Sequence, residues 1–188
     1  MTCIVGIRHD GKVTLGGDSA GVGGYCLTVR ADEKVFKKHD AAGEWWAFGY
    51  TSSFRMGQLI RFNLELPEVR PKPDALFEFM ATRFIDALRR CLKDGGWAEK
   101  KFEQEAGGTV LVGFRGKLFC VEGDFQVGEP VDDYLAVGCG ADVALGAMYA
   151  SSELGSIQSD PDAQVLRALH AAERWSAGVR APFHTVTV

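Results

Sequence analysis

Residues 2–22 read TCIVGIRHDGKVTLGGDSAGV, and they contain the strongest structural signals in the chain. The segment from Thr2 to Arg8 is rich in β-branched residues, and HDGK then supplies an Asp-Gly turn signal. Strand character resumes from Val13 to Leu15 and ends at GGD, residues 16–18. The sequence therefore predicts that the chain opens with a β-hairpin.

The rest of the N-terminal quarter is also β-rich. After the glycine-rich GVGG at 21–24, YCLTVR (25–30) and KVFKK (34–38) predict a second pair of short strands. EWWAFGY (44–50) predicts another strand that is mostly buried. We expect this quarter of the chain to form a sheet.

Helical spacing begins at Ser52 or Ser53, which are good N-cap residues, and continues to Pro67. A longer amphipathic helix is predicted from Pro73 to the glycines at 95–96, with its apolar stripe packed on a sheet. The elements predicted after it are strands 107–114, 117–123 and 133–138, helices 141–154 and 161–175 (the second capped by Ser159 or Asp160), and a strand at 184–188. Blocks of strands alternating with blocks of helices predict an α+β fold.

Composition predicts one globular domain spanning residues 1–188. Hydrophobic residues make up 46% and charged residues 24% of the chain, and the formal net charge is −4. This balance gives no sign of the basic patch that binding to nucleic acid or to an anionic membrane requires. Since the sequence also lacks a long apolar run and a signal-peptide pattern, we expect a cytoplasmic protein.

Cysteines and histidines show no metal-binding pattern. The five cysteines are scattered and form no CxxC pair, and none lies within three or four residues of a histidine. We expect free thiols, no structural zinc and no cofactor.

Thr2 is the first candidate catalytic residue. A small residue after Met1 is of the kind that methionine aminopeptidases expose, and removal of Met1 would give Thr2 a free α-amine. Such an amine, with a reference pKa near 7.7–8.0, can accept the proton of the threonine hydroxyl, so one residue supplies nucleophile and base. Cys3 has no histidine at a motif-like distance and lies on the opposite strand face, which makes a cysteine nucleophile the weaker hypothesis.

The order of motifs resembles the proteasome β-subunit and HslV family of N-terminal-nucleophile hydrolases. Thr2 opens a strand, Asp18 follows after sixteen residues in GGDSAGV, and Lys34 follows after sixteen more in ADEKV. The stretch GCGADVALGAM at 138–148 and ERWSAG at 173–178 extend the resemblance through the chain. The resemblance implies a four-layer αββα sandwich of two antiparallel sheets between helix layers.

The resemblance also implies roles for individual residues. Lys34 would stand beside the nucleophile, lower the pKa of its amine and stabilise the alkoxide, and Asp18 would pair with Lys34 and orient it. Gly49 would donate its amide to the oxyanion, although its interval is one residue longer than the family pattern. The residues implied for the pocket that holds the residue before the cleaved bond are Gly21, Asp32, Ala47 and Thr51.

Two positions depart from the family pattern. Cys139 in GCG stands where the family has a serine that bonds the N-terminal amine, and a thiol is the weaker donor and acceptor. Glu173 and Ser176 correspond to a family aspartate and serine, with the acidic side chain one methylene longer.

By resemblance, the function is a threonine peptidase that acts on a peptide or unfolded protein within a homo-oligomeric ring. The resemblance also makes an ATP-dependent unfoldase a candidate partner. Two alternatives stay open at this point. One is an N-terminal-nucleophile amidohydrolase that acts on a small amide, and the other is a non-catalytic assembly subunit, because fold resemblance alone does not fix function.

Overall fold

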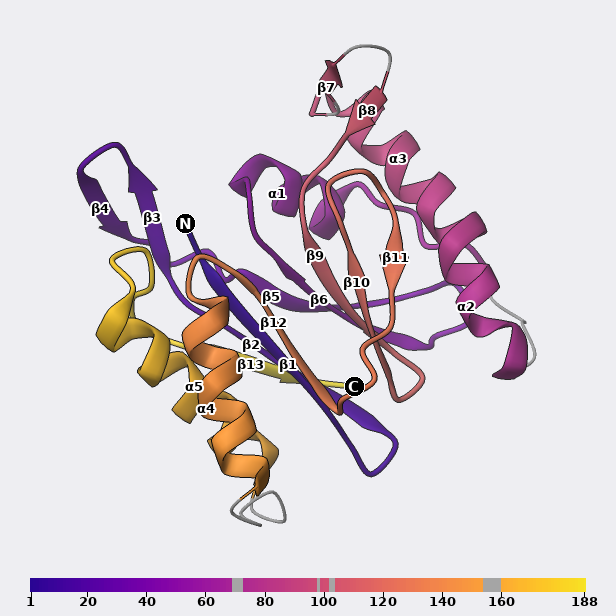
Figure 1. The fold of residues 1–188 in the computed structure, drawn as a ribbon. Coiled ribbons are helices and arrows are strands. Elements are labelled where there is room, and N and C mark those ends of the chain that lie inside the picture. Colours follow the sequence, from indigo (N-terminus) through magenta and orange to yellow (C-terminus); the bar gives the residue numbers. More distant parts are fainter. Residues whose placement is uncertain (69–72, 98, 102–103, 154–159) are drawn as a thin grey trace.

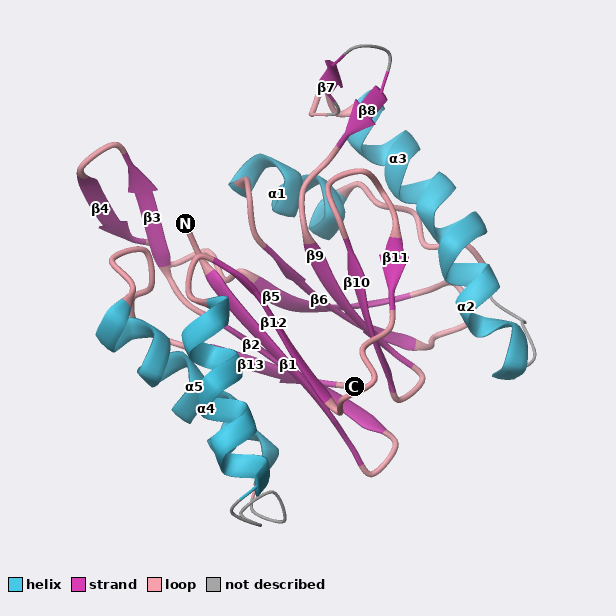
Figure 2. Cartoon of the chain, in the orientation of Figure 1, coloured by secondary structure: helices cyan, strands magenta, loops and turns pink. Residues whose placement is uncertain are grey.

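Two antiparallel sheets lie face to face in the computed structural model, and helices cover both outer faces (Figure 1). The structure describes residues 1–68, 73–97, 99–101, 104–153 and 160–188. Figure 2 shows the same arrangement coloured by secondary structure, with the strands in the middle and the helices outside. The predicted α+β class and αββα layering are confirmed.

The first sheet has four strands in the order β12-β1-β2-β13. Its strands are β1 (Cys3–His9), β2 (Lys12–Gly17), β12 (Tyr134–Gly138) and β13 (His184–Thr187). Helices α4 (Ala141–Glu153) and α5 (Pro161–Trp175) cover its outer face. The predicted opening hairpin is confirmed, and it forms the centre of this sheet.

The second sheet has five strands in the order β11-β10-β9-β6-β5. Its strands are β5 (Val35–His39), β6 (Trp45–Tyr50), β9 (Val110–Phe114), β10 (Lys117–Val121) and β11 (Val127–Gly128). The expectation that the first quarter of the chain makes a sheet of its own is wrong. β5 pairs with β6, and β6 pairs with the later strand β9, whereas β12 pairs with β1. Sheet partners are selected by long-range packing.

The outer face of the second sheet is covered by α1 (Phe54–Phe62) and by one long helical segment. That segment runs through a 3-10 turn, η1 (Pro73–Ala75), then α2 (Leu76–Phe79), a π-helical stretch, η2 (Met80–Phe84), and α3 (Ile85–Asp94). Ser53 caps α1 through its side chain, as predicted. Among the described helices, none is long and apolar enough to cross a membrane.

Two small hairpins lie outside the main sheets. β3 (Ala20–Gly23) pairs with β4 (Cys26–Val29), and β7 (Glu99–Lys101) pairs with β8 (Gln104–Ala106). YCLTVR therefore pairs with the preceding segment, and not with KVFKK as expected. In the C-terminal half, Asp160 caps α5, while the alternative cap at 159 and the predicted helix end at 154 lie outside the described residues.

The alternation along β1 divides its side chains between two layers. Cys3, Val5 and Ile7 pack against α4 and α5, whereas Ile4 packs between the two sheets. The sheets approach closely there, since a Cβ on Gly49 would lie 2.5 Å from the Ile4 side chain. Close approach of the sheets brings the N-terminal end of β1 next to the start of β5.

Candidate active site

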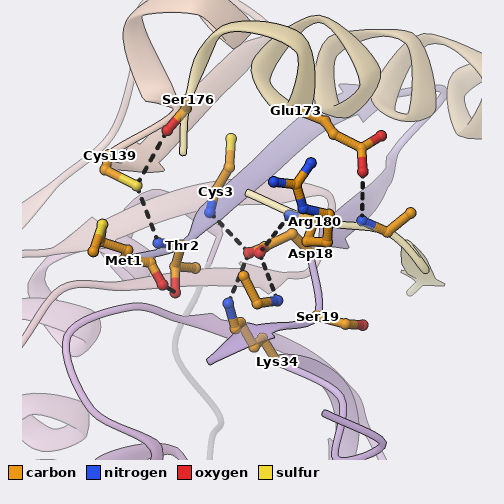
Figure 3. Close-up of polar contacts among 12 residues, drawn as sticks. Met1, Thr2, Cys3, Asp18, Ser19, Lys34, Cys139, Glu173, Ser176 and Arg180 are labelled. Atoms are coloured by element: carbon orange, nitrogen blue, oxygen red, sulfur yellow. Dashed lines mark hydrogen bonds and ion pairs between the residues drawn. The ribbon is translucent and has the colours of Figure 1, made fainter. Parts of the chain in front are cut away.

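Thr2 directly precedes β1 and continues its alternation. Figure 3 shows the Thr2 and Cys3 side chains pointing to opposite sides of the strand, with Thr2 on the side of the facing sheet. Thr2 is 5% exposed beneath Met1, and its hydroxyl donates to the Met1 carbonyl oxygen. The predicted nucleophile therefore lies at the entrance to the space between the sheets.

Asp18 and Lys34 form a buried ion pair that links the two sheets. Asp18 follows β2 of the first sheet, and Lys34 directly precedes β5 of the second. Lys34 Nζ lies 2.8 Å from Asp18 Oδ1, and the two side chains are 1% and 0% exposed. Asp18 and Lys34, which are sixteen residues apart in the sequence, are therefore in direct contact.

Three backbone amides hold the Asp18 carboxylate in place. Cys3 N donates to Oδ1 at 3.0 Å, Ala20 N donates to Oδ2 at 2.8 Å, and Arg180 N donates to Oδ2 at 3.2 Å. Donors from three separate segments stabilise the ionised carboxylate, because hydrogen bonds to a charged acceptor are strong. Since Cys3 follows Thr2 directly, this network ties the ion pair to the nucleophile's own strand (Figure 3).

Burial lowers the pKa of Lys34, and the charge of Asp18 opposes this shift. Desolvation has the larger effect, because the ammonium has lost nearly all its water and has one carboxylate partner. A lysine with a lowered pKa gives up a proton more readily than a solvated one. While it stays charged, its field favours an anion beside it, such as a threonine alkoxide.

Cys139 lies beside the Thr2 nitrogen. Its Sγ is 3.3 Å from Thr2 N and 3.5 Å from Ser176 Oγ, so the three groups form a short chain (Figure 3). Thr2 N is a peptide nitrogen while Met1 is attached, and it would become the α-amine after Met1 is removed. Cys139 is therefore brought to the atom with which the resemblance associates its position, and Ser176 lies next to Cys139.

Glu173 contacts the loop after α5 and His170. Its Oε1 accepts from Ala181 N at 2.9 Å, and its Oε2 lies 3.7 Å from His170 Nδ1. Ser176 is the C-cap residue of α5 and donates its amide to the Ala172 carbonyl. Glu173 thus anchors the loop that follows α5, and this loop delivers the Arg180 amide to Asp18.

Gly49 lies inside β6, between β5 and β9. The Tyr50 amide donates to β5 through Lys34 O, and the Thr51 amide donates to the Thr109 carbonyl on the other side. Because amides alternate along a strand, the Gly49 amide faces β9 and Leu111. This geometry differs from that of a free oxyanion donor, and the missing Cβ of Gly49 instead gives room to Ile4.

The expected pocket residues are dispersed. Ala47 is fully buried between the sheets, while Thr51 lies close to Gly138 and Thr2. Gly21 is in the β3–β4 hairpin, where a Cβ would meet the Arg30 side chain at 2.9 Å. Asp32 accepts two hydrogen bonds from Arg30, both 2.7 Å, and this contact lowers the pKa of the Asp32 carboxyl.

Several groups near the site were not found from the sequence. Arg30 stacks on Phe54, with its guanidinium carbon 3.8 Å from the ring centroid, and Lys34 Nζ lies 5.6 Å from the same ring. The backbone amide of Arg180, which donates to Asp18, is another group near the site that was not predicted. No local pattern marks these residues, because tertiary contacts bring Phe54 to Arg30 and Lys34, and the Arg180 amide to Asp18. Across the described ranges, we find no cluster of three or more His, Cys, Asp or Glu side chains that could hold a metal ion.

Comparison with known proteins agrees with this architecture. No protein-family model matches the chain. HslV from Desulfovibrio desulfuricans, named an ATP-dependent protease subunit, is 28% identical over 163 residues, which are 85% of this chain and 82% of that protein.

Solved structures share the fold across the whole chain. BPH from Thiobacillus denitrificans, in complex with epoxomicin, superimposes with a TM-score of 0.79 at 20% identity, covering 100% of this chain and 98% of that one. HslV from Trypanosoma brucei gives a TM-score of 0.65 at 17% identity, with 99% and 98% covered. Anbu, an ancestral β-subunit from Yersinia bercovieri, gives 0.68 at 13%, with 99% and 81% covered.

Proposed function

We propose that this HslV-like chain, which has the fold of proteasome-like N-terminal-nucleophile hydrolases, is a threonine peptidase whose nucleophile and base are both on Thr2. The observation that supports this most strongly is the buried Asp18–Lys34 pair beside the strand that starts at Thr2. A fully buried ion pair contributes little net stability, since desolvation cancels much of its attraction. A catalytic role gives a reason for this charge to be buried here.

The proposed reaction begins with attack of Thr2 Oγ on a peptide carbonyl carbon. The Thr2 α-amine takes the hydroxyl proton, the peptide C–N bond breaks, and the amine returns that proton to the leaving nitrogen. Water then hydrolyses the ester on Thr2 Oγ, again with the amine as base. Lys34 keeps its proton throughout and stabilises the alkoxide, and Asp18 positions Lys34.

The groups next to the Thr2 nitrogen hold the base in place in this proposal. Cys139 accepts a hydrogen bond from the amine and is itself in contact with Ser176. Glu173 acts indirectly, by fixing the loop that brings Arg180 to Asp18. We assign no catalytic role to Gly49, because its amide faces β9.

Maturation requires removal of Met1. Met1 is 55% exposed, so an aminopeptidase can reach it, and its removal uncovers the buried Thr2. The proposal extends the resemblance to a homo-oligomeric assembly in the cytoplasm that cleaves peptides or unfolded proteins, with an ATP-dependent unfoldase as partner. These last features follow from the similarity to HslV, named an ATP-dependent protease subunit.

The intact mass of the purified protein, before and after treatment with epoxomicin, tests the proposal. We expect the wild type to lack the mass of Met1 and to gain one epoxomicin, and Thr2→Ala to lack Met1 but gain none. Thr2→Ser keeps a hydroxyl and an α-amine, so it should still react. Cys139→Ser is the matched control against labelling of the nearby thiol, and it should still gain the mass of one epoxomicin.

The alternatives predict other outcomes. A non-catalytic assembly subunit would keep Met1 or take up no epoxomicin in any variant. An amidohydrolase for a small amide would lose Met1 and react at Thr2 but cleave none of a diverse set of peptides. Either result would contradict a threonine peptidase.

A further inference from the structure

A cavity of about 450 Å³ opens beside the proposed site, at the end of α5. Its lining includes Arg174, Trp175 and Ser176 from the end of the helix, together with His170, Glu173 and Arg180. Ser176 belongs to both places, because its Oγ also contacts Cys139, which contacts Thr2 N. Two contacts therefore connect a residue of the cavity lining to the nitrogen of the nucleophile.

The nitrogen side of Thr2 is the leaving-group side of the proposed reaction. The α-amine must pass a proton to the leaving nitrogen, so that nitrogen has to come within hydrogen-bond reach of Thr2 N. Cys139 and Ser176 lie on this side of Thr2. Lys34 lies at the start of β5 and is paired with Asp18. The chain that follows the cut thus starts next to the cavity.

The cavity carries an excess of positive charge. No carboxylate among the residues described here pairs with the guanidinium of Arg174 or of Arg180. Glu173 is the one acidic group in the lining, and it is already engaged by the Ala181 amide and His170. The carbonyl end of α5 adds a partial charge of roughly −0.5, which is smaller than the charge of either guanidinium.

Arg180 is held firmly by its backbone. Its amide donates to Asp18 Oδ2 at 3.2 Å, and its carbonyl accepts from Ser19 N at 2.8 Å. Figure 3 shows its guanidinium between Ser176 and Glu173 in the view. Arg174 lies 5.3 Å from the ring centroid of Trp175, a side chain that is 76% exposed and gives the cavity an apolar wall. The planar guanidinium of each arginine can donate two parallel hydrogen bonds to a carboxylate.

We propose that this cavity binds a carboxylate of the substrate on the leaving-group side of the cut. The carboxylate comes from an acidic side chain or from the free C-terminus of a short peptide, and Arg174 and Arg180 are the residues that recognise it. The inference rests on the proposed peptidase function, and it specifies the substrates that the site prefers.

Internally quenched peptides test this proposal. One pair carries Glu or Gln at the first or second position after the cut, and a second pair ends two residues after the cut with a free or an amidated C-terminus. We expect the wild type to prefer the carboxylate member of at least one pair by on the order of 10-fold in kcat/KM, because a hydrogen bond to a charged group contributes that much. The pair that shows the preference identifies the source of the carboxylate.

Arg174→Gln and Arg180→Gln, singly and combined, connect the preference to the cavity. In the combined variant the ratio of kcat/KM between the two members of the preferred pair should fall to about one, whatever the rate on the neutral peptide. Arg89→Gln, on α3 at the opposite helix layer, is the matched control and should keep the full preference. Equal cleavage by the wild type of the two members in both pairs, or a preference that survives in the combined variant, would overturn the proposal.

A binding measurement separates this inference from the peptidase function. The Thr2→Ala protein is titrated by calorimetry with the peptide released after the cut, in its Glu and Gln forms and with a free or an amidated C-terminus. Tighter binding of the carboxylate member of either pair that is lost in the combined arginine variant supports the cavity even if the wild type cleaves nothing. Equal binding of the two members in both pairs overturns it, whatever the activity.

Discussion

The two helix layers of this protein are built from different kinds of side chain. Against the five-stranded sheet, Trp46 stacks on Phe114 with ring centroids 3.7 Å apart and on Phe84 at 5.4 Å. Against the four-stranded sheet, α4 and α5 pack through small residues such as Cys3, Ala144, Ala168 and Ala172. Small side chains let the backbone of α5 and its following loop come close to β1 and β2.

The two layers therefore contribute differently to the stability of the fold and to the chemistry of the site. The aromatic layer buries large apolar surfaces, which stabilise the fold, and its contribution near the site is the ring of Phe54, 5.6 Å from Lys34 Nζ. The small-residue layer brings backbone donors to Asp18 and the end of α5 to Thr2. Variants in the two layers should therefore have different consequences.

Breaking the buried ion pair should have the largest effect. Lys34→Met leaves the Asp18 charge without its partner, and we expect a loss of about 3–5 kcal/mol in the free energy of unfolding. The rate of peptide hydrolysis should also fall on the order of 10²–10³-fold, because the charge that stabilises the alkoxide is gone. Urea unfolding and peptide hydrolysis, measured on the same preparations, provide both values.

The double variant Asp18→Asn/Lys34→Met is the control for this experiment. It removes both charges, so most of the lost stability should return, while hydrolysis should stay low. Recovery of activity together with stability would show that the ion pair acts only in folding.

Truncation in the aromatic layer should have the opposite pattern. Trp46→Ala removes a fully buried ring and should cost about 3–5 kcal/mol of stability, as large cavities do. Hydrolysis, measured at a temperature where the variant is folded, should change little. Trp45→Ala is the matched control, since Trp45 is 53% exposed, and it should shift the unfolding free energy by no more than about 1 kcal/mol.

The smallest predicted effect concerns the contact with the Thr2 nitrogen. Cys139→Ser replaces a thiol by a stronger hydrogen-bond partner, and we expect hydrolysis to rise by about 2–10-fold, as one neutral hydrogen bond allows. Kinetics at several pH values measure the gain, and Cys26→Ser on the exposed β4 should leave the rate unchanged. A lower rate for Cys139→Ser would mean that the thiol itself is needed.

The sequence determined local structure and the spacing of the site. The alternation in TCIVGIR fixes the face on which Thr2 lies, and the sequence predicted the cap of α5 at Asp160, because both depend on residues a few positions apart. The intervals from Thr2 to Asp18 and from Asp18 to Lys34 predicted a cluster, and the structure joins Asp18 to Lys34 at 2.8 Å next to the strand of Thr2.

Only the tertiary structure decided which strands pair and which distant groups reach the site. β12 joins β1 and β9 joins β6, across more than one hundred and roughly sixty residues of intervening chain, and no local pattern encodes such choices. For the same reason, the Arg180 amide on Asp18, the Gly49 amide that faces β9 and the cationic cavity at the end of α5 were not predicted. Periodicity specifies how a segment folds and which face it buries, whereas contacts between distant segments depend on the packing of the whole chain.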